Sequence, residues 1–344
     1  MNMFNPHEYY KRQGVLKELG EVGQRRLKNS KVLIAGIGGL GSISSLYLAL
    51  AGVGRLILVD RDVVDISNLH RQVLYSFNDV RLPKVEAAAR RLKELNPEVE
   101  VEAIAENING ENVFNLVRKV DCVVDGLDNM RTRYLINKAC VKNNIPYIFA
   151  GAIGFEGNIS VIIPHETACL QCFLPDLNDA SLPTCETRGV IGATPGIIGA
   201  MEAMEAIKLL AGIDGGLKGK LLVCDFVTMN YITVDLKRNP NCKVCGEGSE
   251  SELEMEVEAA VLCGSDTVNV NPDKNIRVDL DEAQRILASK YELLISSSLA
   301  ITLKYRGDIE ITIFRNGRML IRNVGSVEEA LKIYRDLMKI LPYS

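Results

Sequence analysis

A cluster of polar side chains follows the short apolar run at residues 56–59 and is well suited to chemistry. It supplies carboxylates, amides and cations at Asp60, Asp62, Asn68, Arg71, Gln72 and Lys84. A carboxylate at a strand end can accept hydrogen bonds from ribose hydroxyls. Amides and cations suit a triphosphate, whose charge grows and moves during reaction. The spacing alone also fits a solvated loop of ordinary charges, so the surrounding elements must decide.

The elements before this cluster predict a nucleotide-binding βαβ unit. A β-branched run at residues 31–35 predicts a strand, residues 42–51 a helix, and residues 56–59 a second strand that ends at Asp60. The turn after the first strand contains Gly36, Gly38, Gly39 and Gly41. Small residues there let the backbone approach a phosphate, and the helix N-terminus attracts the anion. The sequence therefore predicts an adenine-nucleotide site.

A second group of polar residues follows the predicted strand at residues 122–124. Asp125, Asp128 and Asn129 fall at its carboxyl end, where ligands of open α/β sheets bind. Mg²⁺ prefers one or two carboxylates together with phosphate oxygens, so Asp128 is a candidate Mg²⁺ ligand. The alternative for Asp128 is the N-cap of a helix at residues 130–140, and one side chain can serve both purposes.

Two CxxC pairs predict a structural metal site. Cys169 and Cys172 form the first pair, and Cys242 and Cys245 form the second. Paired CxxC units are typical of a closed tetrahedral zinc site, which here would join the middle of the fold to its end. A disulfide or a redox pair is the alternative, although no secretory signal indicates an oxidising compartment.

The chain resembles the MoeB/ThiF/HesA group of E1-like enzymes, which adenylate the C-terminal glycine of ubiquitin-like sulfur-carrier proteins. The resemblance runs from Tyr10 to Gly246. It is carried by YKRQ at 10–13, GEVGQRRL at 20–27, GIGGLGS at 36–42, AGVGRLILVDRDVVDISNLHRQ at 51–72, DGLDNMRTRY at 125–134, GFEGNISV at 154–161, both CxxC pairs and PGIIGAMEAMEAIKLLAG at 195–212.

The resemblance implies the roles of the site residues. ATP would be held with its ribose on Asp60 and its phosphates on Asn68, Arg71 and Lys84, while Asp128 would hold Mg²⁺. Arg12 matches an arginine that family members insert into the partner subunit's ATP site, which implies a homodimer. The implied fold is a Rossmann-like α/β adenylation domain with a mostly parallel sheet.

The implied chemistry needs no general base. A C-terminal carboxylate with a pKa of about 3.5 is ionised at neutral pH and can attack the α-phosphorus of ATP directly. The expected acceptor is a sulfur-carrier protein that ends in Gly-Gly, which adenylation prepares for thiocarboxylation. A peptide or tRNA-bound carboxylate is an alternative acceptor. A non-catalytic scaffold for a ubiquitin-like protein is a further alternative, and a nicotinamide-dependent oxidoreductase would leave the Asn, Arg, Lys and Asp set without a role.

Cys185 lies in a stretch rich in Pro, Asp, Ser, Thr and Gly that follows the first CxxC pair. A thiol on such a loop near an acyl adenylate could attack the mixed anhydride or form a persulfide link, and Arg188 would favour its thiolate. The matching cysteine has such a role in some family members and is dispensable in others. The C-terminal part of the chain does not resemble a rhodanese domain, because it has no cysteine-centred active-site loop, so any persulfide donor is expected to be a separate protein.

Composition is that of a cytoplasmic enzyme. The 344 residues are 47% apolar with a net charge of −4. This balance gives no reason to expect nucleic acid as a partner. We find neither an apolar signal core nor an uncharged window of transmembrane length, so no membrane association is expected.

The end of the chain predicts a separate small domain. We expect an adenylation domain with its zinc site over residues 1–247, an acidic linker over 248–258 and an α+β domain over 259–344. Strands are predicted at 259–262, 267–270, 291–296, 300–305, 309–314 and 319–322, and helices at 280–289 and 327–341. The domain could dock a carrier or a sulfur donor, stabilise a dimer, or act as a passive cap.

Overall fold

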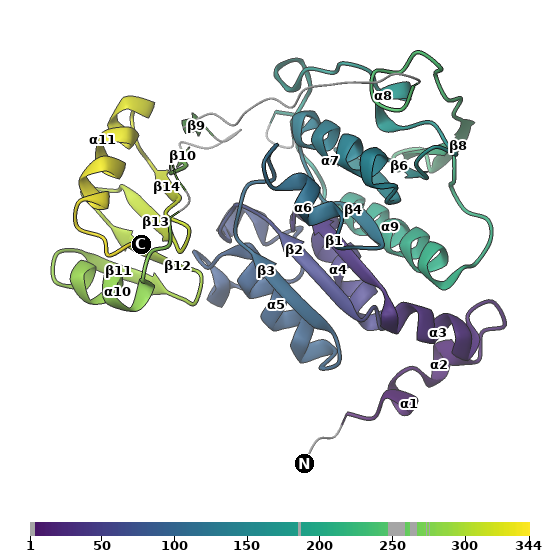
Figure 1. Cartoon of the computed structure of the whole chain (residues 1–344), viewed down its shortest axis with the longest axis horizontal. Helices are drawn as coiled ribbons and strands as arrows, with labels where there is room; N and C mark the ends of the chain where they lie inside the picture. Colours follow the sequence, from purple (N-terminus) through teal and green to yellow (C-terminus); the bar gives the residue numbers. More distant parts are fainter. Residues whose placement is uncertain (1–3, 185–186, 247–258, 262–266, 273, 275) are drawn as a thin grey trace.

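The computed structural model describes residues 4–184, 187–246, 259–261, 267–272, 274 and 276–344. Two sheets organise these residues (Figure 1). The larger has the strand order β3-β2-β1-β4-β5-β6-β7-β8, and the smaller has the order β11-β12-β13-β14-β10-β9. The predicted combination of an α/β domain with a mostly parallel sheet and a small α+β domain is confirmed.

The large sheet is parallel in its first half and antiparallel in its second. Strands β3, β2, β1, β4 and β5 run parallel, whereas β6, β7 and β8 each pair antiparallel with the strand before. Their bounds are Lys31–Ala35 (β1), Arg55–Val59 (β2), Glu100–Ile104 (β3), Cys122–Asp125 (β4), Tyr147–Ile153 (β5), Glu156–Ile162 (β6), Lys220–Asp225 (β7) and Asn230–Asp235 (β8).

Helices cover both faces of this sheet because its central strands are apolar on both sides. Val32 and Ile34 of β1 pack in one core with α4, α5 and α9, while Leu33 and Ala35 pack in a second core with α6 and α7. The helix bounds are Pro6–Tyr9 (α1), Lys11–Gly14 (α2), Gly20–Asn29 (α3), Gly39–Ala51 (α4), Lys84–Leu95 (α5), Val113–Val117 (α6), Met130–Asn143 (α7), Leu170–Phe173 (α8) and Ala193–Ala211 (α9). Short 3₁₀ turns span Ile66–Asn68 (η1), Phe77–Asp79 (η2) and Asp179–Ser181 (η3).

The C-terminal domain is an antiparallel sheet with two helices on one face. Its elements are Ala259–Val261 (β9), Thr267–Val270 (β10), Leu280–Ala288 (α10), Glu292–Ser296 (β11), Ala300–Lys304 (β12), Glu310–Phe314 (β13), Met319–Arg322 (β14) and Val327–Met338 (α11). Alternate residues such as Ile301, Ile311 and Ile321 pack under the two helices. The other face packs on the large domain, where Phe314 and Leu320 contact Val63.

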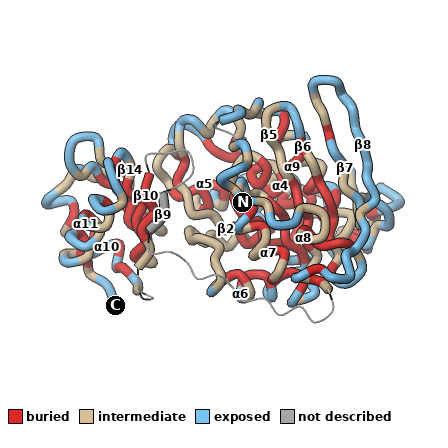
Figure 2. Tube along the Cα trace, turned by 90° about the horizontal axis from the view of Figure 1, so that it is seen from above, coloured by how far each residue is buried: buried red, intermediate tan, exposed pale blue. Residues whose placement is uncertain are grey.

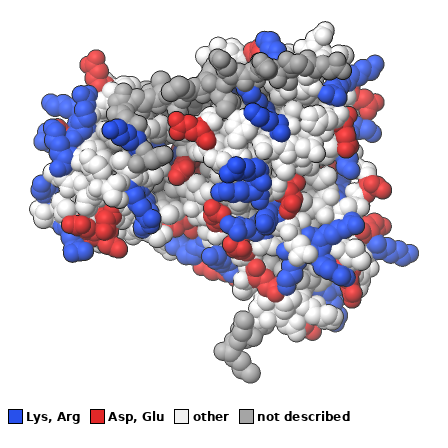
Figure 3. Space-filling model, in the orientation of Figure 1, with Lys and Arg blue, Asp and Glu red and all other residues white. Residues whose placement is uncertain are grey.

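The surface gives two further observations. Acidic and basic side chains are interspersed on the described part of the face in Figure 3, without an extended basic region. Strand β8 lies at the edge of the large sheet and is exposed along its whole length (Figure 2). None of the helices among the described residues is both long and apolar enough to cross a membrane.

Candidate active site

The predicted glycine turn joins β1 to α4 and leaves no room for a side chain at Gly36 or Gly41. Gly36 has a φ of +86°, and a Cβ on Gly41 would lie 1.9 Å from the Gly36 carbonyl oxygen. Helix α4 begins at Gly39, three residues earlier than the sequence predicts, so Gly41 belongs to its first turn. No side chain caps this helix, and its first N–H groups are therefore placed to meet an anion.

Asp60 ties the glycine turn to the loop after β2. Its carboxylate accepts hydrogen bonds from the backbone N–H of Ile37 at 2.7 Å and of Asp62 at 2.8 Å. Burial raises the pKa of this carboxyl, and the charge of Lys84 opposes the rise. Each carboxylate oxygen accepts one of these bonds and keeps a further lone pair, as a ribose contact requires.

Lys84 begins α5 and points at Asp62. Its Nζ lies 3.0 Å from Asp62 Oδ2, and its side chain is only 7% exposed. Burial lowers the pKa of Lys84, but the carboxylates of Asp62, Asp60 and Asp128 outweigh this effect and raise it. Although burial opposes the change, Lys84 and Arg61 lower the pKa of Asp62 to about 2. Lys84 and Asp62 are thus both charged at neutral pH. Asp128 lies close enough for its charge to act on Lys84.

Arg71 and Gln72 follow η1 and approach the glycine turn, while Asn68 is the last residue of η1. Arg71 Nη1 donates to the Ser67 carbonyl at 2.9 Å, and a Cβ on Gly39 would lie 3.9 Å from Arg71 Cδ. Gln72 is buried, and a Cβ on Gly38 would lie 3.9 Å from its Nε2. Asn68 is partly exposed and contacts Ser67 Oγ. The fold therefore places two of these side chains, Arg71 and Gln72, beside the glycine turn.

Two roles were considered for Asp128, a Mg²⁺ ligand and the N-cap of the following helix, and the structure gives the second role to Asn129. The prediction that Asp128 could cap the following helix is wrong, because Asn129 is the N-cap of α7 and accepts from the Thr132 N–H at 2.9 Å. Asp128 is exposed and accepts a bond of 3.1 Å from the Asn129 amide. Its carboxylate is consequently accessible to a cation. A carboxylate is one of the ligands that Mg²⁺ prefers, together with phosphate oxygens.

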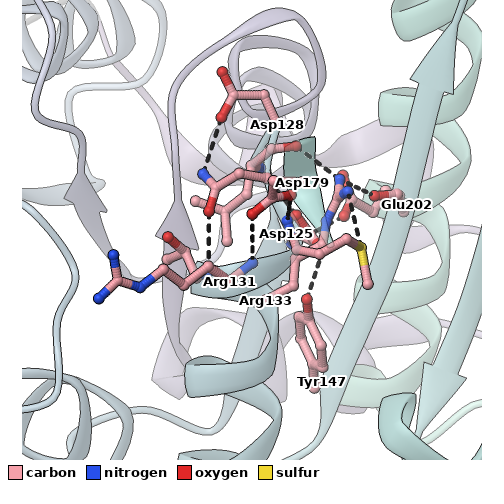
Figure 4. Close-up of polar contacts among 12 residues, drawn as sticks. Asp125, Asp128, Arg131, Arg133, Tyr147, Asp179 and Glu202 are labelled. Atoms are coloured by element: carbon pink, nitrogen blue, oxygen red, sulfur yellow. Dashed lines mark hydrogen bonds and ion pairs between the residues drawn. The ribbon is translucent and has the colours of Figure 1, made fainter. Parts of the chain in front are cut away.

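A buried network behind Asp128 holds its loop (Figure 4). Asp125 Oδ2 accepts from Arg133 Nε at 3.0 Å and from the Tyr147 hydroxyl at 2.5 Å. Arg133 also donates to the Leu127 carbonyl at 2.7 Å, next to Asp128. Glu202 of α9 accepts from the Asp125 N–H at 3.0 Å. The network fixes the backbone at the carboxyl end of β4 from three elements.

Sequence reasoning missed Asp179, Glu202 and Tyr147. Asp179 accepts from the N–H groups of Met130 at 2.6 Å and Arg131 at 3.1 Å, at the start of α7. The partner residues are distant in the chain, so no local pattern marks Asp179 or Tyr147. Only Glu202 could have been found from the sequence. An acidic residue on the apolar face of a helix that packs inside a domain needs a polar partner, and this indicates a buried polar contact.

Arg12 does not reach the nucleotide turn of its own chain. Its neighbour Gln13 donates to the carbonyl of Ala51, the last residue of α4, at 2.8 Å. The glycine turn lies at the other end of this helix, and a helix of 13 residues is about 20 Å long. Arg12 is exposed. Arg12 therefore lies too far away to contribute to the glycine turn of its own chain.

The four predicted metal ligands converge on one point. The sulfurs of Cys169, Cys172, Cys242 and Cys245 lie within 4.8 Å of one another. The separations are 3.9 Å for Cys169–Cys172, 3.6 Å for Cys169–Cys242 and 3.4 Å for Cys172–Cys245. Tetrahedral zinc with Zn–S bonds of about 2.3 Å requires sulfurs about 3.8 Å apart. The cluster fits structural zinc, and these separations exceed a disulfide bond length of about 2.05 Å.

Cys185 lies outside the described residues. Arg188, which was expected to favour its thiolate, pairs with Glu156 at 2.5 Å. Glu156 begins β6, so this ion pair attaches the end of the loop to the antiparallel part of the large sheet. The role of Cys185 stays a prediction.

Comparison with known proteins places this geometry in context. A family model described as the ThiF family matches residues 10–244. The SAMP-activating enzyme E1 of Haloferax volcanii is 42% identical over 246 residues, which cover 71% of this chain and 91% of that protein. The sulfur carrier protein ThiS adenylyltransferase of Bacillus subtilis is 32% identical over 341 residues, covering 94% of this chain and 97% of that protein. The second match therefore extends into the C-terminal domain.

A solved structure shares the fold of the large domain. The crystal structure of Escherichia coli MccB with MccA-N7isoASN superimposes with a TM-score of 0.62 at 29% identity, covering 70% of this chain and 77% of that one.

Proposed function

The chain belongs to the ThiF family, and we propose that it uses ATP and Mg²⁺ to adenylate the C-terminal Gly-Gly carboxylate of a ubiquitin-like sulfur-carrier protein. The enzyme class follows from its relatives: it is an E1-like adenylyltransferase. The observation that carries the proposal is the convergence of the uncapped α4 turn, Lys84 and Asp128 at the carboxyl ends of β1, β2 and β4.

These residues suit a reaction that depends on position and charge. The attacking carboxylate is ionised at neutral pH, so no side chain has to remove a proton. Asn68, Arg71 and Lys84 would bind the phosphates and offset the charge on the departing pyrophosphate. Asp60 would hold the ribose. Asp128 would hold Mg²⁺, which supplies further charge neutralisation when bound.

A protein acceptor is supported by the exposed edge of the large sheet. The hairpin of β7 and β8 exposes apolar side chains at Val227, Met229, Tyr231, Ile232 and Val234. Exposed apolar side chains at a sheet edge mark a surface that binds another protein. We propose that the partners include such a carrier and a second copy of this chain, which contributes Arg12, within the cytoplasm. Sulfur would come from a separate persulfide donor, and Cys185 is a candidate for the covalent link.

A peptide acceptor is the second candidate. It is favoured by the structural match to MccB, whose crystal was prepared with MccA-N7isoASN. The higher identity to carrier-protein adenylyltransferases supports the first candidate.

The test is ATP–pyrophosphate exchange by the purified protein with Mg²⁺ and each Gly-Gly-ending carrier from the same genome. We expect exchange with one carrier, its loss in Asp128→Ala, and wild-type exchange in Asp214→Ala, a control at an exposed carboxylate. Asp128 is exposed, so its replacement should leave Tm unchanged. Absence of exchange with every carrier would move the proposal to a peptide or tRNA-bound carboxylate.

A further inference from the structure

We propose that the C-terminal domain is part of the nucleotide site, with Arg318 as a positioning residue that holds the loop carrying Asp62, Asn68, Arg71 and Lys84. This inference rests on the proposed function only in assigning ATP to that loop. It distinguishes among the roles considered for the domain, because a passive cap or a remote docking module need not contact the site. The contacts lie at both ends of residues 61–86 and therefore bracket the phosphate ligands.

Arg318 forms the first contact, with the backbone between Asp60 and Asp62. It is 2% exposed, and its Nη2 donates to the carbonyls of Arg61 at 2.7 Å and Ala105 at 3.2 Å. Arg61 stands between Asp60 and Asp62, so the guanidinium fixes the backbone that aims both. Nη1 donates to Asn269 Oδ1 at 2.9 Å, and the group stacks on Phe314 with its Cζ 3.7 Å from the ring centroid.

The charge of Arg318 also faces this site. Burial lowers the pKa of Arg318 to about 9, while Asp62 and Asp60 act to raise it. The guanidinium remains charged at neutral pH. Replacing it by an apolar side chain would leave two partly buried backbone carbonyls without this donor, a change that favours movement of the loop.

Arg81 forms the second contact, three residues before Lys84. It has a φ of +74°, a left-handed conformation that costs a non-glycine residue free energy unless its surroundings hold it. The C-terminal domain supplies that support. Glu310 accepts two hydrogen bonds from the Arg81 guanidinium, at 2.9 and 2.6 Å, and the Thr302 hydroxyl donates to the Arg81 carbonyl at 3.4 Å.

Smaller contacts join these two. Val63 packs against Ala300, Phe314 and Leu320, and Glu86 Oε1 accepts from the N–H and hydroxyl of Ser298. The domain therefore holds the loop in one conformation before ATP arrives. Preorganisation of this kind raises affinity because less ordering remains for the ligand to impose.

The first experiment measures ATP binding by calorimetry in the full chain. Arg318→Met should raise the Kd for ATP about ten-fold, the loss expected when a buried charged donor is removed. Arg335→Met is the matched control, because Arg335 is exposed on α11 and donates only within its own helix among the described residues. Amide exchange should accelerate in residues 61–86 of Arg318→Met and stay unchanged in α7.

Turnover gives a readout that general destabilisation would not mimic. With a carrier that supports exchange, Arg318→Met should raise the KM for ATP while the KM for the carrier stays unchanged. Nucleotide binding needs no carrier, so failure of the proposed acceptor leaves the binding test intact. A folded Arg318→Met protein with the wild-type Kd and loop exchange would overturn the inference.

A charge-swap cycle at the contact of Arg81 with Glu310 tests whether the C-terminal domain supports the loop, even where Arg318→Met does not fold. Arg81→Glu and Glu310→Arg should each weaken ATP binding, because each places like charges together at the contact. The double variant restores the opposite pairing and should recover most of the affinity. Double-variant binding no tighter than either single variant would overturn the inference.

Discussion

Glu202 shows how one buried carboxyl can fix the backbone near Asp128. It lies on α9, is fully buried, and accepts the backbone N–H of Asp125. Burial raises its pKa well above the ordinary value, and the neighbouring Asp125 charge adds to the rise, while Arg133 opposes it. Glu202 therefore stays protonated where an exposed glutamate would be ionised. Its place in the network links α9 to the strand end that carries Asp128.

This raised pKa predicts a pH-dependent stability. Between the unfolded pKa of about 4.3 and the raised folded pKa, unfolding releases a proton, so stability falls by about 1.4 kcal/mol per pH unit as pH rises. Glu202→Gln keeps the accepting oxygen and removes the titration. We expect its Tm to exceed that of the wild type at neutral pH by several degrees, with the difference vanishing near pH ~4.

Thermal unfolding followed by circular dichroism across this pH range checks the expectation. Glu166→Gln, at an exposed position, provides the control and should show no pH-dependent difference from the wild type. A Tm difference for Glu202→Gln that stays constant from acid to neutral pH would contradict the assignment.

Two helices of this protein are held by side chains from distant parts of the chain. Helix α7 is capped locally by Asn129, while Asp179 of η3 accepts two further N–H groups at its start. Helix α8 is similarly tied by Cys169 and Cys172 to a segment 73 residues later. Helix α8 has only four residues and is too short to be stable alone, so its tertiary ties decide whether it forms.

The cysteine cluster predicts that metal removal loosens α8. Cys242→Ser should abolish bound zinc and lower Tm by about 10 °C, since a cross-link closing a loop of this length contributes a few kcal/mol. Metal analysis of the purified protein gives the zinc content. Cys224→Ala, at a buried cysteine of β7 outside the cluster, should retain the metal. Equal zinc in both variants would rule out the four-cysteine site.

The whole molecule brings together two sheets, and its proposed second copy completes the site. Within one chain Arg12 is exposed, and its neighbour Gln13 bonds to the end of α4 that lies far from the glycine turn. The C-terminal sheet, by contrast, lies against the loop that follows β2 in its own chain (Figure 1). In the proposed dimer, each site is therefore supported by the C-terminal domain of its own chain and receives Arg12 from the other chain.

Mixing two inactive variants tests this arrangement. Arg12→Ala and Asp128→Ala should each lose ATP–pyrophosphate exchange. After subunit exchange, a mixed dimer would retain one intact site, with Asp128 from one chain and Arg12 from the other. About a quarter of wild-type activity should return, because half of the dimers are mixed and each has one site of two. No recovery despite mixed dimers, verified by mass spectrometry, would show that Arg12 acts within its own chain or not at the site.

The local elements of both domains were predictable from sequence because their signals are local. The glycine turn, the apolar runs of β1 and β2, and the alternation along β12 and β13 act over a few residues. The predicted C-terminal strands and helices differ from the observed ones by only a few residues at their ends wherever these are described. The convergence of the four cysteines was also predictable, because paired CxxC units are typical of a zinc site.

The sequence by itself determined which residue types were available to bind phosphate, Mg²⁺ and zinc, and which short elements present them. Only the tertiary structure decided that Asn129 rather than Asp128 caps α7, that Asp179 joins this helix, and that Arg318 holds Arg61 across 257 residues. The physical reason is range: backbone periodicity is set by neighbouring residues, whereas burial, ion pairing and support of a strained backbone depend on surfaces that meet only after the chain has folded.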